Sequence, residues 1–216
     1  MNAGTPNETI LAPNHEFFDR ARSRLTRDVP AALTDETLPG ARGDLDLDPL
    51  LWEKAGAKAT KPAAVLVPIV ARAEPHVLLT QRTAQLRSHS GQIAFPGGKI
   101  DPVDETPLAA ALREAEEEIG LDAKFIDPIG YLDLYLTFSG FRILPLVARV
   151  EPDYRLSINP GEVSEAFEVS LKFLMQPDNH EFLTRDWKGI DRRYYAMPFG
   201  ERYIWGVTAE IGRAHV

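Results

Sequence analysis

The chain has 216 residues, and 44% of them are hydrophobic, which is enough to build a core and argues against a largely disordered protein. It contains no cysteine, so disulfides, thiol nucleophiles and cysteine-bound zinc are excluded. Its formal net charge of -8 disfavours nonspecific binding to nucleic acid, and an anionic ligand would need a local basic pocket or a metal ion.

No apolar run approaches the roughly 20 residues that span a bilayer, and the N-terminus lacks the basic and then apolar order of a secretory signal. We therefore expect a cytoplasmic protein that has neither a membrane nor a nucleic acid as its partner. A homodimer is left open by the sequence.

The first 55 residues are predicted to form a helical N-terminal arm and linker, and residues 56–216 the main domain. In the arm, residues 14–27 place Phe18, Ala21 and Leu25 on one face of an amphipathic helix. Residues 38–49, which are rich in aspartate, proline and glycine, predict a loop.

In the main domain, apolar and partly β-branched runs between turn signals predict strands, and two further segments are predicted to be short helices. The predicted strands cover residues 62–70, 76–81, 126–138, 142–150, 192–199 and 201–206, and the predicted helical segments 170–177 and 207–214. Mixed strands with a few helices predict an α+β protein or a three-layer sandwich.

Between these strands, Thr106 and Pro107 signal the start of a further helix and Gly120 its end. At about 100° per residue, its apolar residues fall within an arc of roughly 60° and predict the buried stripe. These residues are Leu108, Leu112, Ala115 and Ile119.

On another face of this helix, Glu114, Glu117 and Glu118 follow the i, i+3, i+4 spacing. One interpretation is a solvated acidic face, because like charges at this spacing cost only about 0.2 to 0.5 kcal/mol per pair. The other is a site for Mg²⁺ or Mn²⁺, which prefer carboxylate and water oxygens. The preceding pair Gly97 and Gly98 favours the second, because glycines allow tight turns and let a ligand approach.

The stretch REAEEEIGL, from Arg113 to Leu121, resembles the Nudix box, which also has an upstream acid where Glu105 stands. Lys99 occupies the position of the box glycine, so the loop carries one extra residue, and either Asp104 or Glu105 takes the part of the upstream acid. In addition, Ala115 replaces a bulky aliphatic residue.

The resemblance implies a Nudix hydrolase with an α/β/α sandwich around a mixed sheet, which cleaves a diphosphate linked to a nucleoside. It also implies that Glu114, Glu117 and Glu118 act in catalysis and bind Mg²⁺ or Mn²⁺. We expect Arg113 to pair with one of these glutamates and to fix its rotamer.

Upstream, LLTQRTAQLRSHSGQIAFPGG at residues 78–98 holds Arg82 and Arg87, whose guanidinium groups suit phosphate contacts, although two solvated arginines are the alternative. The stretch resembles the signature of the coenzyme A diphosphatase branch of the Nudix family, with Thr83 in place of serine or alanine. The resemblance implies that coenzyme A or its thioesters are cleaved to 3′,5′-ADP and 4′-phosphopantetheine. Arg82, Arg87, Gly97 and Gly98 are then the substrate-binding residues.

Further along the chain, Glu162 and Glu165 lie in a predicted loop before a strand, where Nudix enzymes often have another metal ligand or general base. We assign the catalytic part to Glu162, with Glu165 as the alternative. Two other functions stay open: hydrolysis of another nucleoside diphosphate such as ADP-ribose, and a non-catalytic Nudix-fold binding module.

Overall fold

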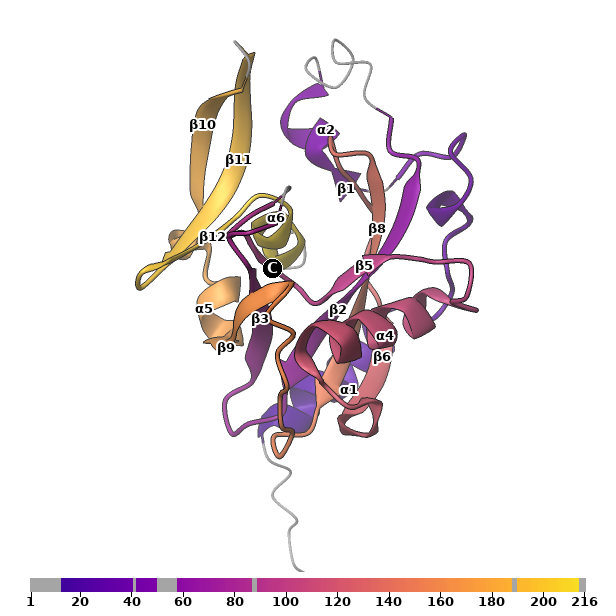
Figure 1. Ribbon diagram of the computed structural model, residues 1–216, viewed down its shortest axis with the longest axis vertical. Helices are drawn as coiled ribbons and strands as arrows, with labels where there is room; N and C mark the ends of the chain where they lie inside the picture. The colour runs from indigo at the N-terminus through magenta and orange to yellow at the C-terminus, as the bar shows by residue number, and fades with distance from the viewer. Residues whose placement is uncertain (1–12, 41, 50–57, 87–88, 188–189, 214–216) are drawn as a thin grey trace, which may run out of the picture.

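The computed structural model describes residues 13–40, 42–49, 58–86, 89–187 and 190–213. Within these residues the strands form two sheets, a large mixed sheet and a smaller antiparallel one (Figure 1). The strands of the large sheet are β1 (Arg42–Gly43), β2 (Lys61–Val70), β3 (His76–Arg82), β4 (Ile93–Ala94), β5 (Gly97–Lys99), β6 (Ile126–Tyr131), β7 (Tyr135–Leu136), β8 (Phe141–Val150) and β9 (Val163–Ser170). The small sheet comprises β10 (Glu181–Trp187), β11 (Ile190–Phe199) and β12 (Arg202–Trp205).

The helices cover both faces of the large sheet. They are α1 (Pro13–Arg24), α2 (Asp44–Leu47), α4 (Pro107–Ile119), α5 (Leu171–Met175) and α6 (Val207–Arg213), with 3-10 turns at Ala31–Leu33, Ala123–Phe125 and Pro177–Asn179. One hydrophobic core lies under α4, and the other lies under α1, α5 and α6. The predicted α+β fold with helices on both faces of a mixed sheet is therefore confirmed.

Strand β2 lies at the centre of the large sheet and shows how both cores are built. It runs parallel to β8 over its whole length and antiparallel to β3 and β5. Its Ala64 and Leu66 belong to the core under α4, and Val67 and Ile69 to the core on the opposite face. This division follows from the pleat, because successive side chains of a strand point to opposite faces.

Helix α4 begins and ends where its sequence predicts. The Thr106 hydroxyl accepts a hydrogen bond from the amide of Ala109 at 3.1 Å, and Gly120 has the left-handed conformation that ends the helix, with φ of 65°. Its most deeply buried face is built by small residues, Ala110, Ala111 and Ala115, together with Ile119. Alanines at this face let the helix lie close to the sheet, so the glutamates are held directly above the sheet.

Two predicted segments differ from the structure. Residues 38–49 are not all loop, because β1 and α2 form there. Asp44 anchors α2 through contacts that composition cannot reveal: its carboxylate accepts hydrogen bonds from the Tyr135 hydroxyl at 2.9 Å and the Phe138 amide at 2.7 Å. The single strand predicted at 126–138 is divided into β6 and β7, because its pairing with β8 ends at Tyr131 and resumes at Tyr135.

The N-terminal segment packs against the rest of the molecule. Phe18 of α1 is buried in the core shared with α5 and α6, and Leu33 is buried in the core under α4. The predicted domain boundary between residues 55 and 56 falls at 50–57, outside the described residues, so the division stays a prediction. No helix in the described part of the chain is long and apolar enough to cross a membrane. The homodimer and the cytoplasmic location stay predictions.

Candidate active site

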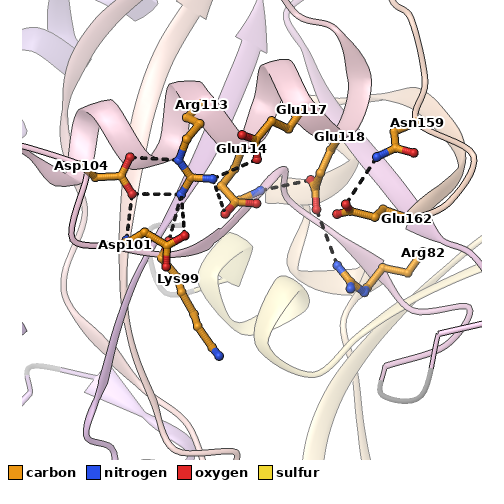
Figure 2. Close-up of polar contacts among 11 residues, drawn as sticks. Arg82, Lys99, Asp101, Asp104, Arg113, Glu114, Glu117, Glu118, Asn159 and Glu162 are labelled. Atoms are coloured by element: carbon orange, nitrogen blue, oxygen red, sulfur yellow. Dashed lines mark hydrogen bonds and ion pairs between the residues drawn. The ribbon is translucent and has the colours of Figure 1, made fainter.

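Arg113 of α4, whose side chain is 24% exposed, joins the acidic side chains of the predicted site (Figure 2). Its Nε and Nη2 donate to the two oxygens of Asp104, each at 2.9 Å, and its Nη1 donates to Glu114 at 3.0 Å and to Glu117 at 2.9 Å. A bidentate pair of this kind fixes the plane of the guanidinium group. The expectation that Arg113 pairs with a box glutamate therefore agrees with the structure.

The upstream acid that contacts Arg113 is Asp104. Its side chain is 4% exposed, and the Arg113 guanidinium holds the pKa of Asp104 below its usual range. One of its oxygens also accepts a hydrogen bond from the amide of Asp101 at 2.8 Å, so the carboxylate closes the loop before α4. Glu105, by contrast, is exposed. The extra residue in the loop thus places the aspartate, and not the glutamate, against the arginine.

Glu118 is the buried carboxylate of the cluster, with 2% of the residue exposed. Burial raises its pKa to about 7, although the amide of Gly97 and the Arg82 guanidinium both favour the charged form. The Gly97 amide donates to its Oε2 at 3.2 Å, and Nη1 of Arg82 lies 3.6 Å from its Oε1. Burial also raises the pKa of the neighbouring Glu114. Glu117 is different, because its side chain is 57% exposed.

The glycine pair lets β5 lie close to both α4 and β2. A Cβ at Gly98 would lie 2.7 Å from the carboxylate of Glu114, and a Cβ at Gly97 would lie 2.5 Å from the carbonyl oxygen of Ala64. Gly97 also has φ of 149°, a conformation that other residues rarely adopt. Both glycines therefore have a structural task beside the substrate contact predicted for them.

Glu162 lies on a turn that is tied to the end of α4. The amide of Asn159 donates to the carbonyl of Glu118 at 2.9 Å, and the amide of Thr83 donates to the carbonyl of Glu162 at 2.9 Å. Figure 2 shows the Glu162 and Glu118 side chains extending toward each other, with Arg82 beside them. The negative charge of Glu162 contributes to the raised pKa of Glu118. The structure thus brings Glu162 to the box glutamates.

Glu165 lies on strand β9 and not in the predicted loop. Its carboxylate is paired with Arg202 of β12, whose guanidinium group also lies over the ring of Phe167 at 4.3 Å. Of the two predicted substrate arginines, Arg82 reaches the cluster through Glu118, and Arg87 lies outside the described residues. The contact between Arg82 and Glu118 was not predicted, and the sequence gives no local signal for it.

The donor set suits Mg²⁺ or Mn²⁺ in its chemistry, since carboxylate oxygens are the ligands these ions prefer. The described side chains do not, however, form a group of three or more acids or histidines already arranged to hold an ion. Arg113 accounts for this arrangement, because it engages Glu114 and Glu117, while Glu118 turns to Gly97 and Arg82. Binding of an ion would require the glutamates to exchange these contacts for the metal.

The sequence matches the NUDIX domain family over residues 60–189. This chain therefore belongs to the Nudix hydrolases, enzymes that act on nucleoside diphosphate derivatives and generally use divalent metals such as Mg²⁺ or Mn²⁺.

Among curated proteins the chain is similar to two that are each described as an uncharacterized Nudix hydrolase NudL. The protein from Photorhabdus laumondii is 40% identical over 149 residues, which cover 69% of this chain and 80% of the relative. The protein from Klebsiella pneumoniae is 40% identical over 153 residues, covering 71% and 80%. Among solved structures, an Ap4A hydrolase from C. elegans matches with a TM-score of 0.42 and 23% identity, over 51% of this chain and 80% of that one.

Proposed function

We propose that this Nudix hydrolase cleaves the diphosphate bond of coenzyme A or its thioesters, giving 3′,5′-ADP and 4′-phosphopantetheine or its acyl form. The observation that carries the proposal is the contact between Arg82 and Glu118. Arg82 belongs to the stretch that resembles the coenzyme A signature, and Glu118 belongs to the Nudix box. Their contact supports one site in which the substrate arginine and the acidic cluster serve the same diphosphate.

Glu114, Glu117 and Glu118 are the residues that would hold Mg²⁺ or Mn²⁺. A bound ion would supply polarisation of the phosphoryl oxygens and would offset the charge on the leaving phosphate. Arg113 positions Glu114 and Glu117 through its fixed contact with Asp104. Glu162, on the turn beside Glu118, takes the proton of the attacking water.

Arg82 has a hydrogen-bond donor available for a phosphate oxygen. Its side chain is 27% exposed beside Glu118, so part of it can meet a ligand. Its Nε, by contrast, is buried and makes no hydrogen bond within the described residues, which costs about 1 to 3 kcal/mol. Because Arg82 already lies beside Glu118, we assign it to the diphosphate, next to the bond that breaks.

The test is a comparison of kcat/KM on coenzyme A and on ADP-ribose with Mg²⁺ or Mn²⁺. We expect coenzyme A to be the better substrate. Arg82→Ala should lower kcat/KM on coenzyme A and on dephospho-coenzyme A alike, by roughly 10- to 100-fold for one charge-assisted contact. Arg27→Ala, which changes an exposed arginine beyond α1, serves as the matched control. A preference for ADP-ribose would contradict the proposal.

A further inference from the structure

Residues of α2, β10, β11, β12 and α6 line a hollow away from the acidic cluster. Figure 1 shows where these elements lie. The volume of the hollow is about 380 Å³, near the lower end of the roughly 300 to 1,000 Å³ of small-molecule sites. A hollow of this size accommodates part of a nucleotide and not the whole of coenzyme A. Much of its wall comes from residues 192–210, which lie beyond the NUDIX match at 60–189.

Three arginines, Arg185, Arg192 and Arg193, line this hollow. Arg185 on β10 stands directly opposite Arg192 on β11 in the register of the hairpin. Like charges placed opposite each other destabilise an antiparallel pair, so this arrangement has an energetic cost in the free protein. An anion bound between them would offset that cost.

Two of the three arginines already have acidic partners. Nη2 of Arg192 lies 2.9 Å from the buried Asp44 carboxylate, and Nε of Arg193 lies 3.8 Å from Asp48. Arg185 is exposed and makes no ion pair with any residue that the structure describes. In a protein with a net charge of -8, this cation is therefore available to an anionic group of a ligand.

An aromatic pair completes the wall of the hollow. Tyr194 and Trp205 meet edge to face, with ring centroids 5.6 Å apart and planes inclined at 70°. Both rings line the hollow, and aromatic side chains are the groups on which nucleic acid bases stack. The lining also contains the acids Asp44, Asp186 and Glu210. Beside them it offers one cation without an ion pair among the described residues, Arg185, for a phosphate and aromatic surface for a base.

The hollow is linked to the active site through Gln92. The carbonyl of Gln92 accepts a hydrogen bond from the amide of Arg82 at 3.0 Å. Its side-chain Nε2 lies 3.8 Å from the position of a Cβ on Gly206, which lines the hollow. Arg82 in turn contacts Glu118. Gln92 therefore lies between Arg82 and the edge of the hollow, and the inference below takes one substrate to extend past it.

We propose that this hollow is the subsite for the phosphorylated nucleoside half of the substrate, with Arg185 at the 3′-phosphate and the Tyr194–Trp205 pair beside the base. The inference rests on the proposed function, because the 3′-phosphate is a group that coenzyme A has and ADP-ribose lacks. It assigns the two phosphate positions to different residues. Arg82 serves the diphosphate, and Arg185 serves the 3′-phosphate.

The test is equilibrium binding by isothermal titration calorimetry, without metal ions, of 3′,5′-ADP and of AMP, which lacks the 3′-phosphate. We expect Arg185→Ala to raise the Kd for 3′,5′-ADP by roughly 10- to 100-fold, as for one lost charge-assisted contact. The Kd for AMP should stay nearly unchanged. Trp205→Leu should weaken the binding of both ligands, and Arg27→Ala should change the binding of neither. Absence of binding to the wild type, or equal binding of 3′,5′-ADP by Arg185→Ala and Arg27→Ala, would overturn the subsite.

A parallel assay on coenzyme A and dephospho-coenzyme A separates this inference from the proposed function. If 3′,5′-ADP binds through Arg185 but coenzyme A is not hydrolysed, the subsite stands and the proposed function fails. If coenzyme A is hydrolysed but Arg185→Ala leaves the preference for it over dephospho-coenzyme A unchanged, the function stands and the subsite fails.

Discussion

Glu162 and Glu165 stand three residues apart, yet their neighbours give them different tasks. Glu162 lies on the turn that is hydrogen-bonded to the end of α4, and its negative charge contributes to the raised pKa of Glu118. Glu165 is engaged by Arg202 on the neighbouring part of the sheet. The position of the first carboxylate fits the general base that we propose, whereas the second holds β9 to β12.

Glu162→Gln should lower kcat by about 10²- to 10⁴-fold and change KM little, because a general base acts in the transition state. Glu165→Gln is the matched control and should retain a kcat near that of the wild type. Steady-state kinetics on coenzyme A at saturating metal measures both. Equal losses in the two variants would show that neither acid is the base that we assign.

Glu118 makes the stability of the metal-free protein depend on pH. The pKa of this carboxyl is raised from 4.5 to about 7 in the folded state. Between these values the unfolded chain releases the proton that the folded chain keeps, so stability falls as pH rises. The loss is complete above the folded pKa and absent below the unfolded one.

We therefore expect the wild type, with metal ions chelated, to lose on the order of 3 kcal/mol of stability between pH 4.5 and pH 7 relative to Glu118→Gln. Urea denaturation at several pH values measures the difference. If the free energy of unfolding changed with pH equally in the two proteins, burial would not raise the pKa of Glu118.

At the scale of the element, the loop before α4 is held by Asp104. Its carboxylate joins Arg113 on the helix to the amide of Asp101 in the loop. The family pattern points one residue further on, to Glu105, because spacing alone cannot show how the extra residue is accommodated.

Asp104→Ala should lower the Tm by several degrees, because charge-assisted hydrogen bonds contribute about 1.5 to 3 kcal/mol and a domain of this size loses about 2 to 4 °C per kcal/mol. The control Glu105→Ala should stay within about 1 to 2 °C of the wild type, as surface substitutions usually do. Differential scanning calorimetry of both variants decides between them, and a larger loss in Glu105→Ala would reverse the assignment.

A second prediction at this scale concerns strand β5, because a Cβ on each of its two glycines would meet different neighbouring atoms. A Cβ at Gly97 would meet the backbone of β2, which cannot move without breaking the sheet. The three atoms nearest to a Cβ at Gly98 all belong to the end of the Glu114 side chain, which can turn away.

Gly97→Ala should therefore reduce the amount of folded protein and its Tm sharply. Gly98→Ala should keep most of its stability and lose activity, because the displaced Glu114 leaves its place in the cluster. Circular dichroism melts and turnover of coenzyme A measure the two effects. The prediction fails if Gly98→Ala unfolds as readily as Gly97→Ala.

At the scale of the whole molecule, the sequence predicts the elements whose signals are local. Helix α4 is confirmed because Thr106 and Gly120 mark its ends, and β2 and β8 because they are predominantly apolar runs with buried residues on both faces. Helix α2 is missed because Asp44 is anchored by Tyr135 and Arg192, residues 91 and 148 positions away. No local pattern reports contacts over such distances.

The same limit applies to the site. The spacing of Glu114, Glu117 and Glu118 is local, so the sequence predicts that they share one face of a helix. The contact of Arg82 with Glu118 depends on how β3, β4 and β5 fold back against β2, and it can be seen only in the assembled sheet.

The central claim is that the acidic cluster on α4 cleaves the diphosphate of coenzyme A with a divalent metal. Mass spectrometry of the products after incubation with coenzyme A and Mg²⁺ or Mn²⁺ tests it most directly. We predict equal amounts of 3′,5′-ADP and 4′-phosphopantetheine, no product with a chelator, and a loss on the order of 10²-fold or more in folded Glu118→Gln, by analogy with lost charge stabilisation in other enzymes. Intact coenzyme A after incubation with folded protein and either metal, or products cut at any other bond, would contradict the account.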